Sequence, residues 1–201
     1  MPKKQIKRNT EKKKEYTEWG DPVLSNVTKP LSMAYIRSTE FKKIIARMFS
    51  LIEGKGVGLA ANQIGMPLRF AIVMIEPNPL RPNLVPLPRT VLVNPKILRY
   101  SKEKQAGWEG CMSCPGSIRF YVPRARWVDV EYIDGWTYKK IEKRVEGFQA
   151  IVFQHEIDHL YGMVCGEQVM TKNGKVLPGA IISVDWYLKT KASPPKAMKS
   201  K

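Results

Sequence analysis

The sequence predicts an α+β fold built from short, mostly antiparallel strands. Two stretches carry the periodicity of helices, and several apolar runs between them have the length of strands. Turn-rich connections join the runs, whereas parallel strands need long crossovers. At 201 residues, 43% of them hydrophobic, the chain can form one domain with a full core.

The first helix is expected over Thr39–Ile52. Its apolar residues recur three and four positions apart and form one stripe, which indicates a helix face turned to the core. Ser38 or Thr39 can cap the start of this helix, and Gly54 suits its end. The stripe consists of Phe41, Ile44, Ile45, Met48, Phe49 and Ile52.

A glycine- and alanine-rich segment follows at residues 56–65, and its small side chains suit close approach by a backbone or a ligand. It lacks the third glycine and the Gly-Lys-Ser/Thr ending of phosphate-binding loops, so we expect no nucleotide site. Strands are expected at residues 69–75 and 90–94. The proline- and asparagine-rich residues 76–89 predict a loop between them.

A half-buried strand is indicated at residues 128–132, where apolar and acidic residues alternate. The dipeptide Asp134-Gly135 then predicts a tight hairpin turn. The strand expected at residues 138–145 pairs back on the first. A second helix follows, and this arrangement of hairpins and separate helices is typical of α+β proteins.

The net charge is +16, and much of it lies near the two ends of the chain. Residues 1–16 hold seven basic and two acidic side chains, and residues 187–201 hold five basic and no acidic ones. We therefore expect a basic flexible arm at residues 1–18, one domain at residues 19–188 and a basic tail at residues 189–201.

Basic tails are usually solvated, but they can also attract RNA in a salt-dependent manner, for instance on the ribosome. No aromatic stacking pattern accompanies the lysines, and we expect no specific DNA partner. No apolar run reaches the length of a membrane span, so no membrane partner is expected. Three cysteines do not suggest a disulfide framework and favour the cytoplasm, with organellar import as the alternative.

Both histidines of the chain, His155 and His159, lie four residues apart between Gly147 and Gly162. On a helix, this spacing places both imidazoles on one face, one turn apart. With Glu156 between them, the pair predicts a metal site that has a general base beside it. The alternative is two unrelated surface or core side chains.

A catalytic metal site needs a third protein ligand and an open position. The soft candidates are Cys111, Cys114 and Cys165. The first two form a CxxC pair, but no second pair completes a zinc ribbon, and the strand-to-helix context of a redox pair is missing. Cys165 closely follows Gly162 and would have to fold back. Spacing and composition leave the choice of ligand open.

Three segments, taken in order, resemble the motifs of the peptide deformylase family. They are GVGLAANQ at residues 56–63, EGCMS at 109–113 and QHEIDH at 154–159. The ordered triple is far more specific than each motif alone, and the resemblance extends from residue 20 to residue 169.

The resemblance implies a catalytic domain of short antiparallel sheets around the histidine helix. It implies a metal-dependent hydrolase that removes the N-formyl group from the N-terminal formyl-methionine of newly made polypeptides and releases formate. Cys111, His155 and His159 would hold one divalent ion, usually Fe²⁺ in this family, with Zn²⁺, Ni²⁺ or Co²⁺ able to replace it.

The resemblance also assigns catalytic roles. Glu156 would move protons, while the side-chain amide of Gln63 and the backbone N–H of Met112 would donate to the oxyanion. The substrate-binding positions implied are Val57, Gly58, Gly110, Phe148, Ile151 and Val152.

Two residues near the ligands have expected structural roles: Asp158 fixes the local network without binding metal, and Cys114 is a small packing residue. Two other functions are alternatives. A zinc peptidase shares the His-Glu-x-x-His pattern, but Cys111 and Gln63 argue against it. An RNA-binding module with a structural metal would need a fourth ligand and would not need Glu156.

Overall fold

The structure, a computed structural model, describes residues 15–77, 83–169, 171–172, 175–176 and 180–183. The helices are α1 (Pro22–Ser25), α2 (Met33–Ile36), α3 (Thr39–Ile52) and α4 (Gly147–Leu160), with 3-10 turns η1 (Ala61–Ile64) and η2 (Cys165–Glu167). The strands are β1 (Gly58–Ala60), β2 (Phe70–Ile75), β3 (Leu87–Tyr100), β4 (Lys104–Glu109), β5 (Ile118–Ala125), β6 (Trp127–Asp134), β7 (Lys140–Glu146), β8 (Thr171–Lys172), β9 (Lys175–Val176) and β10 (Ile181–Ser183).

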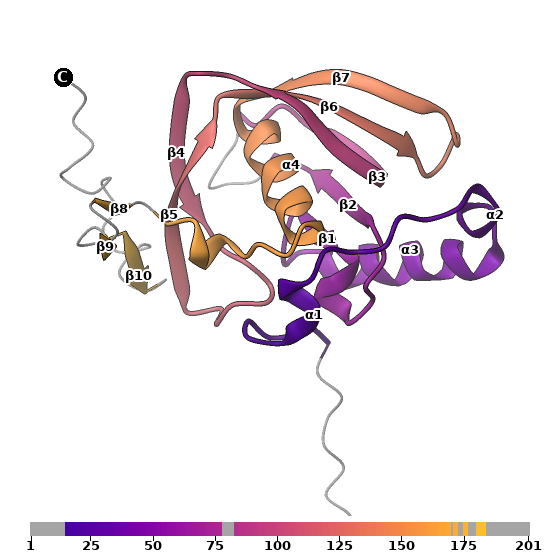
Figure 1. The fold of residues 1–201 in the computed structure, drawn as a ribbon, viewed down its shortest axis with the longest axis horizontal. Helices are drawn as coiled ribbons and strands as arrows, with labels where there is room; N and C mark the ends of the chain where they lie inside the picture. Colours follow the sequence, from indigo (N-terminus) through magenta and orange to yellow (C-terminus); the bar gives the residue numbers. More distant parts are fainter. Residues whose placement is uncertain (1–14, 78–82, 170, 173–174, 177–179, 184–201) are drawn as a thin grey trace, which may run out of the picture.

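The strands form antiparallel sheets around α4. One sheet has the order β1-β2-β3-β6-β7, a second has the order β10-β5-β4, and β8 pairs with β9. Helix α4 lies between the two larger sheets, and α3 lies on the far side of the first (Figure 1). The predicted α+β fold, with a central histidine helix among short antiparallel sheets, is confirmed.

Strand β2 is buried on both faces, which explains its unbroken apolar sequence. Phe70 and Ile72 belong to the core beneath α3, whereas Val73 and Ile75 belong to the core that contains α4 residues. Because successive strand residues point to opposite faces, a strand between two helices has no polar face. Helix α3 has the predicted bounds, and the hydroxyl of Ser38 accepts a hydrogen bond from the backbone N–H of Phe41 at 3.1 Å.

Strand β3 is longer than predicted: the loop expected up to residue 89 ends earlier, and the strand expected up to residue 94 continues to Tyr100. Two irregularities accommodate the residues that argued against a strand. Pro88 lies where the pairing with β2 shifts register, so its missing N–H costs no ladder bond. Asn94 adopts a positive φ of 51° beside a second register shift, against β6.

The predicted hairpin between β6 and β7 is confirmed, but residues 135–139 connect the two strands, so the turn is longer than a tight Asp-Gly turn and β7 begins at Lys140 instead of residue 138. The side chain of Asp134 accepts hydrogen bonds from the backbone N–H groups of Trp136, at 3.1 Å, and Thr137, at 2.7 Å. The expected alternation fails at Asp129, which is 5% exposed because Arg99 and Arg144 cover and neutralise it.

Strands β4 and β5 were not expected from the sequence. β4 is poor in β-branched residues, and β5 contains Pro123, opposite Ala106.

The predicted basic tail lies outside the described residues, as does the predicted arm up to residue 14. From residue 15 the chain is described, and Tyr16 donates a hydrogen bond to the carbonyl of Leu51 at 2.7 Å. None of the described helices has both the length and the apolar character needed to cross a membrane.

Two glycines with positive φ allow a matched test of the packing at the end of α4. Gly162 has φ +81°, and an added Cβ would lie 2.6 Å from the carbonyl oxygen of Ser25. Gly54 has φ +67° with open space around it. We expect Gly54→Ala to lower the free energy of unfolding by about 1 kcal/mol, and Gly162→Ala by about 3 kcal/mol or more, measured by urea denaturation. Equal losses would contradict this packing.

Candidate metal centre

Helix α4 brings His155, Glu156 and His159 to one place. The helix begins at Gly147, which has a positive φ of 57°, and is buried along much of its length, so its polar side chains point into the protein. The two imidazoles meet with 4.9 Å between ring centroids, and their Nε2 atoms are 3.3 Å apart. The predicted one-turn spacing therefore places two nitrogen donors together.

Cys111 joins this pair from the connection between β4 and β5. Its Sγ lies 3.2 Å from Nε2 of His159. Donor atoms of Cys111, His155 and His159 all lie within 4.8 Å of one another. The fold thus brings together three residues that the sequence singled out, although Cys111 and His159 are 48 positions apart.

The spacing of these donors fits a divalent metal ion. Tetrahedral coordination with metal–nitrogen bonds of about 2.0–2.1 Å places two nitrogens about 3.3 Å apart, which matches the imidazole pair at 3.3 Å. The set of one thiolate and two imidazoles suits borderline-soft ions such as zinc or iron.

A buried ion-pair network supports His155 from behind. Nδ1 of His155 lies 2.8 Å from Glu109, so the ring donates its N–H to this carboxylate and leaves Nε2 facing the other donors. Arg124 binds both oxygens of Glu109, at 2.8 and 2.9 Å, and also contacts Asp158. Gln168 completes the network by donating to Asp158 at 2.8 Å.

The network sets the charge of its members. Burial raises the pKa of Glu109, but the hydrogen bonds from Arg124 and His155 prevail and hold it below its usual value. Burial likewise lowers the pKa of Arg124, and the hydrogen bonds and charges of Glu109 and Asp158 outweigh it, so the pKa is raised. Glu109 and Arg124 therefore remain charged at neutral pH, and they form a buried ion pair.

Glu156 is 4% exposed, and burial raises its pKa to about 7. Its Oε2 has no hydrogen-bond partner among the described residues. Gly58 of β1 lies directly against it, since an added Cβ would be 2.4 Å from Oε1. Gly58 therefore leaves room for this carboxylate, a role that the sequence did not indicate.

Gln63 has one defined orientation. Its side-chain oxygen accepts a hydrogen bond from the backbone N–H of Ala60 at 2.8 Å, so its NH₂ group must point the other way. That NH₂ group donates to Sγ of Cys111 and to the hydroxyl of Ser113, both at 3.3 Å. The predicted oxyanion donor thus reaches the three-donor cluster.

The other predicted backbone contacts lie on both sides of α4. Strand β1 is an edge of its sheet, and the carbonyl of Val57, just before it, accepts from the N–H of Met74 at 2.8 Å. Met112 adjoins Cys111, and its side chain packs against the core beneath α3. Gly110 follows the edge strand β4, and an added Cβ would lie 2.8 Å from the guanidinium of Arg119.

The predicted methionine-pocket positions lie on α4. Val152 is 4% exposed and belongs to the core, and the half-buried Phe148 packs against that core. Ile151 is half-buried, and its Cδ1 would lie 3.7 Å from a Cβ added at Gly107 of β4. The structure places these residues on the first turns of the helix, before His155.

Sequence reasoning missed the position of Cys165. The chain does fold back after Gly162, and the sulfur atoms of Cys111, Cys114 and Cys165 lie within 4.8 Å of one another. Hydrogen bonds from the two other thiols hold the pKa of Cys111 well below its usual value, and the bond to Cys111 raises the pKa of Cys114 to about 12. Only the backbone reversal at Gly162 could have signalled this contact.

Comparison with known proteins identifies the family. The family model described as polypeptide deformylase matches residues 13–175. The chain belongs to the polypeptide deformylase family. Deformylases are metal-dependent hydrolases that remove the N-formyl group from newly made polypeptides, so the resemblance seen in the three motifs is confirmed.

Individual deformylases are similar over most of the chain. Peptide deformylase 1 of Bordetella pertussis is 40% identical over 158 residues, 77% of this chain and 88% of its own. The deformylase of Leptospira biflexa serovar Patoc is 37% identical over 147 residues, which cover 72% of this chain and 81% of that protein. A Met-Ala-Ser-bound class I type b deformylase structure from Acinetobacter baumannii superposes with a TM-score of 0.72 at 34% identity, covering 77% of this chain and 96% of that one.

The network behind His155 predicts a large loss of stability when Arg124 is replaced. Arg124→Met leaves Glu109 and Asp158 buried without their cation, and we expect about 3–5 kcal/mol less unfolding free energy. The control Arg99→Met replaces a side chain that is 71% exposed, and Asp129 keeps Arg144, so we expect a loss under about 1 kcal/mol.

Adding Glu109→Gln to Arg124→Met should recover part of the stability, because one unpaired charge disappears. Chemical denaturation of the unchanged protein, the Arg124 variant, the Arg99 variant and the double variant measures these differences. Similar stability of the Arg124 and Arg99 variants would contradict the proposed importance of the buried pairs.

Proposed function

We propose that this chain hydrolyses the N-formyl group of N-terminal formyl-methionine through the site formed by Cys111, His155 and His159. The observation that carries the proposal is the convergence of these three donors beside Glu156 and the amide of Gln63. One divalent ion would be held by the three donors, with Fe²⁺ as the proposed native metal and Zn²⁺, Ni²⁺ or Co²⁺ as substitutes. When bound, such an ion supplies Lewis acidity that polarises a carbonyl and acidifies water.

Glu156 is the proposed proton carrier. Its carboxylate takes a proton from the attacking water and later delivers one to the leaving amine, so that the formamide and water become formate and a free amino group. Its buried position favours this role, because a carboxylate with a raised pKa accepts and returns a proton near neutral pH.

Gln63 and the backbone N–H of Met112 are the proposed donors to the developing oxyanion. The amide of Gln63 is held in place by Ala60, and it points toward Cys111 before substrate arrives. Preorganised donors of this kind each lower a barrier by about 3 kcal/mol.

The substrate would bind as an extended strand between the edge strands β1 and β4. Both edges have backbone groups available for strand addition, and Gly58 and Gly110 would contribute theirs. The carbonyl of Val57 already accepts a hydrogen bond from the N–H of Met74, so we assign the substrate contact of Val57 to its other atoms. Phe148, Ile151 and Val152 would line the pocket for the methionine side chain. The Met-Ala-Ser ligand of the Acinetobacter baumannii enzyme supports a peptide that begins with methionine.

Residues 19–188 are proposed as one catalytic domain that acts in the cytoplasm on nascent chains. The lysine-rich residues 1–18 and 189–201 would contact ribosomal RNA through its phosphates. Co-sedimentation with ribosomes should then weaken as salt rises, and it should be lost when residues 1–14 and 189–201 are removed, which keeps Tyr16 and Thr17 in place.

The proposed function is tested by formate release from formyl-Met-Ala-Ser. Protein prepared without oxygen and loaded in parallel with Fe²⁺, Ni²⁺ or Zn²⁺ should release formate. Glu156→Gln should lower the rate by about 10²–10⁴-fold while metal content is retained. Cys111→Ser should lower both rate and metal content.

The matched control for Glu156→Gln is Glu142→Gln, which changes an exposed glutamate on β7 and should leave the rate unchanged. A folded, metal-loaded protein that releases no formate with any of the three ions would overturn the proposal.

Two glycines separated by one residue test the position of Glu156. Gly58→Ala should displace the carboxylate and lower kcat by about 10²-fold, since misplacement of a reacting group by about 1 Å has such effects. Gly56→Ala adds a Cβ at an ordinary 3.7 Å from Met112 and should retain activity. Metal content, measured by elemental analysis, should stay the same in both. Equal activity of the two variants would argue against the close contact between Gly58 and Glu156.

A further inference from the structure

The three cysteines of the chain gather in one cluster, although only one of them has a proposed role in deformylation. Their sulfur atoms lie within 4.8 Å of one another. Cys111 and Cys114 come from the connection between β4 and β5, and Cys165 begins η2, after the histidine helix. Two thiols therefore accompany the proposed sulfur ligand without a function in the reaction.

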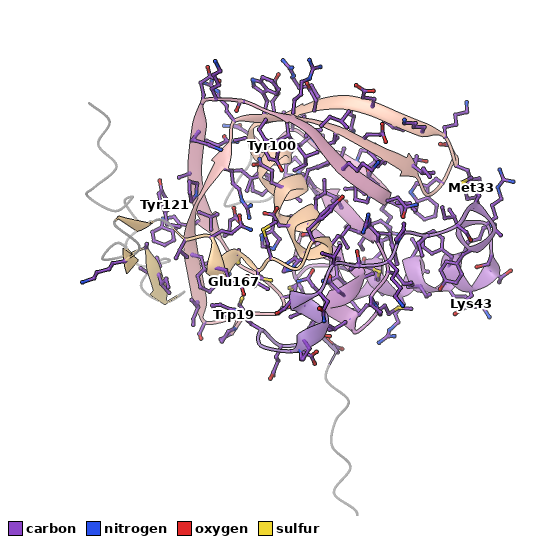
Figure 2. All side chains as sticks on the ribbon, viewed as in Figure 1. Trp19, Met33, Lys43, Tyr100, Tyr121 and Glu167 are labelled. Atoms are coloured by element: carbon purple, nitrogen blue, oxygen red, sulfur yellow. The ribbon has the colours of Figure 1, made fainter. Side chains whose placement is uncertain are left out.

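The position of Cys165 depends on contacts that tie η2 to the beginning of the described chain. Trp19 packs so closely on Gly166 that a Cβ there would lie 2.4 Å from its ring. The indole N–H also lies 3.4 Å from the carboxylate of Glu167, and Figure 2 shows Trp19 and Glu167 next to each other. The thiol cluster is thus part of the packed structure.

Access to solvent differs among the three thiols. Cys111 is half-buried, whereas Cys114 is 6% and Cys165 is 2% exposed. The two buried thiols pack in an apolar cluster with Leu24 and Phe120. A small oxidant from solvent would therefore reach Cys111 before the two other thiols, which lie deeper in the protein.

The backbone favours Cys114 as the partner of Cys111 in a disulfide. The N–H of Cys114 donates to the carbonyl of Cys111 at 3.1 Å, which closes a four-residue turn. Such turns hold their first and last Cα atoms less than about 7 Å apart, and disulfides span Cα distances of about 4.4–6.8 Å. A bond between these two sulfurs therefore needs little movement of the backbone.

We propose that Cys111 is a reversible oxidation site whose sulfenic acid is captured by Cys114, with hydrogen peroxide as the oxidant. The sulfur of Cys111 attacks one oxygen of hydrogen peroxide, an S–O bond forms and the O–O bond breaks, and the released hydroxide takes up the thiol proton of Cys111 and leaves as water. The sulfur of Cys114 then attacks the sulfenic sulfur, the S–S bond forms, and the oxygen leaves with the thiol proton as a second water. Two thiols are oxidised by two electrons, and hydrogen peroxide is reduced to two waters.

The disulfide would remove the sulfur donor from the proposed metal site and protect Cys111 from irreversible oxidation to sulfinic and sulfonic acid. The effect on activity rests on the proposed function, whereas the disulfide itself does not. A thiol reductant would restore the donor.

The experiment uses the full chain, reduced, with and without bound Ni²⁺, and hydrogen peroxide as the probe. Intact mass should fall by two hydrogens, with release of nickel from the loaded protein. Trypsin places Cys111 and Cys114 on one peptide, residues 105–119, and Cys165 on another, residues 145–172. The disulfide should appear within the first peptide, and reductant should restore mass, nickel binding and formate release.

Matched variants identify the partner. Cys114→Ala, and Cys114→Ser as a second version, should gain oxygen atoms on Cys111 that reductant does not remove after excess peroxide. Cys165→Ala should still form the disulfide. A cross-link between the two peptides, or oxygen addition to Cys111 in the unchanged protein as in the Cys114 variants, would overturn the proposal. Mass and nickel content report on it even if the protein releases no formate.

Discussion

The buried ion pairs of the Arg124 guanidinium are the interactions on which the site depends. The guanidinium links Glu109 at the end of β4 to Asp158 on α4, and Glu109 in turn holds the ring of His155. Taking these charges out of water costs several kcal/mol per ion, and only a complete set of hydrogen bonds offsets that cost. The network therefore forms as a unit, and it couples the second sheet to the helix that carries both imidazoles.

Close approach of backbones is the second requirement. Strand β1 lies against α4 with Gly58 facing Glu156, and the end of α4 lies against α1 with Gly162 facing Ser25. A side chain at either glycine would push apart elements that come from distant parts of the sequence. The small residues of the 56–65 segment thus serve the internal packing of the site as well as any ligand.

The residues just before α1 support the site from a third direction. The backbone N–H of Thr17 donates to the carbonyl of Gln63, and that of Trp19 donates to the carbonyl of Ser113, both at 2.7 Å. Gln63 and Ser113 are themselves joined through their side chains. The segment thereby fastens η1 to the loop that carries Cys111, so the proposed oxyanion donor and the proposed sulfur ligand keep a fixed separation.

The sequence by itself determined the features that depend on local spacing. Helical periodicity located α3, the four-residue spacing of His155 and His159 placed two donors on one helix face, and the ordered motifs identified the family. Only the tertiary structure decided which distant groups meet. Cys165 reaches Cys111, Gly58 makes room for Glu156, and β3 continues through Asn94. Periodicity reports which face of an element is apolar, whereas these contacts depend on how backbone reversals and packed elements bring separate segments together.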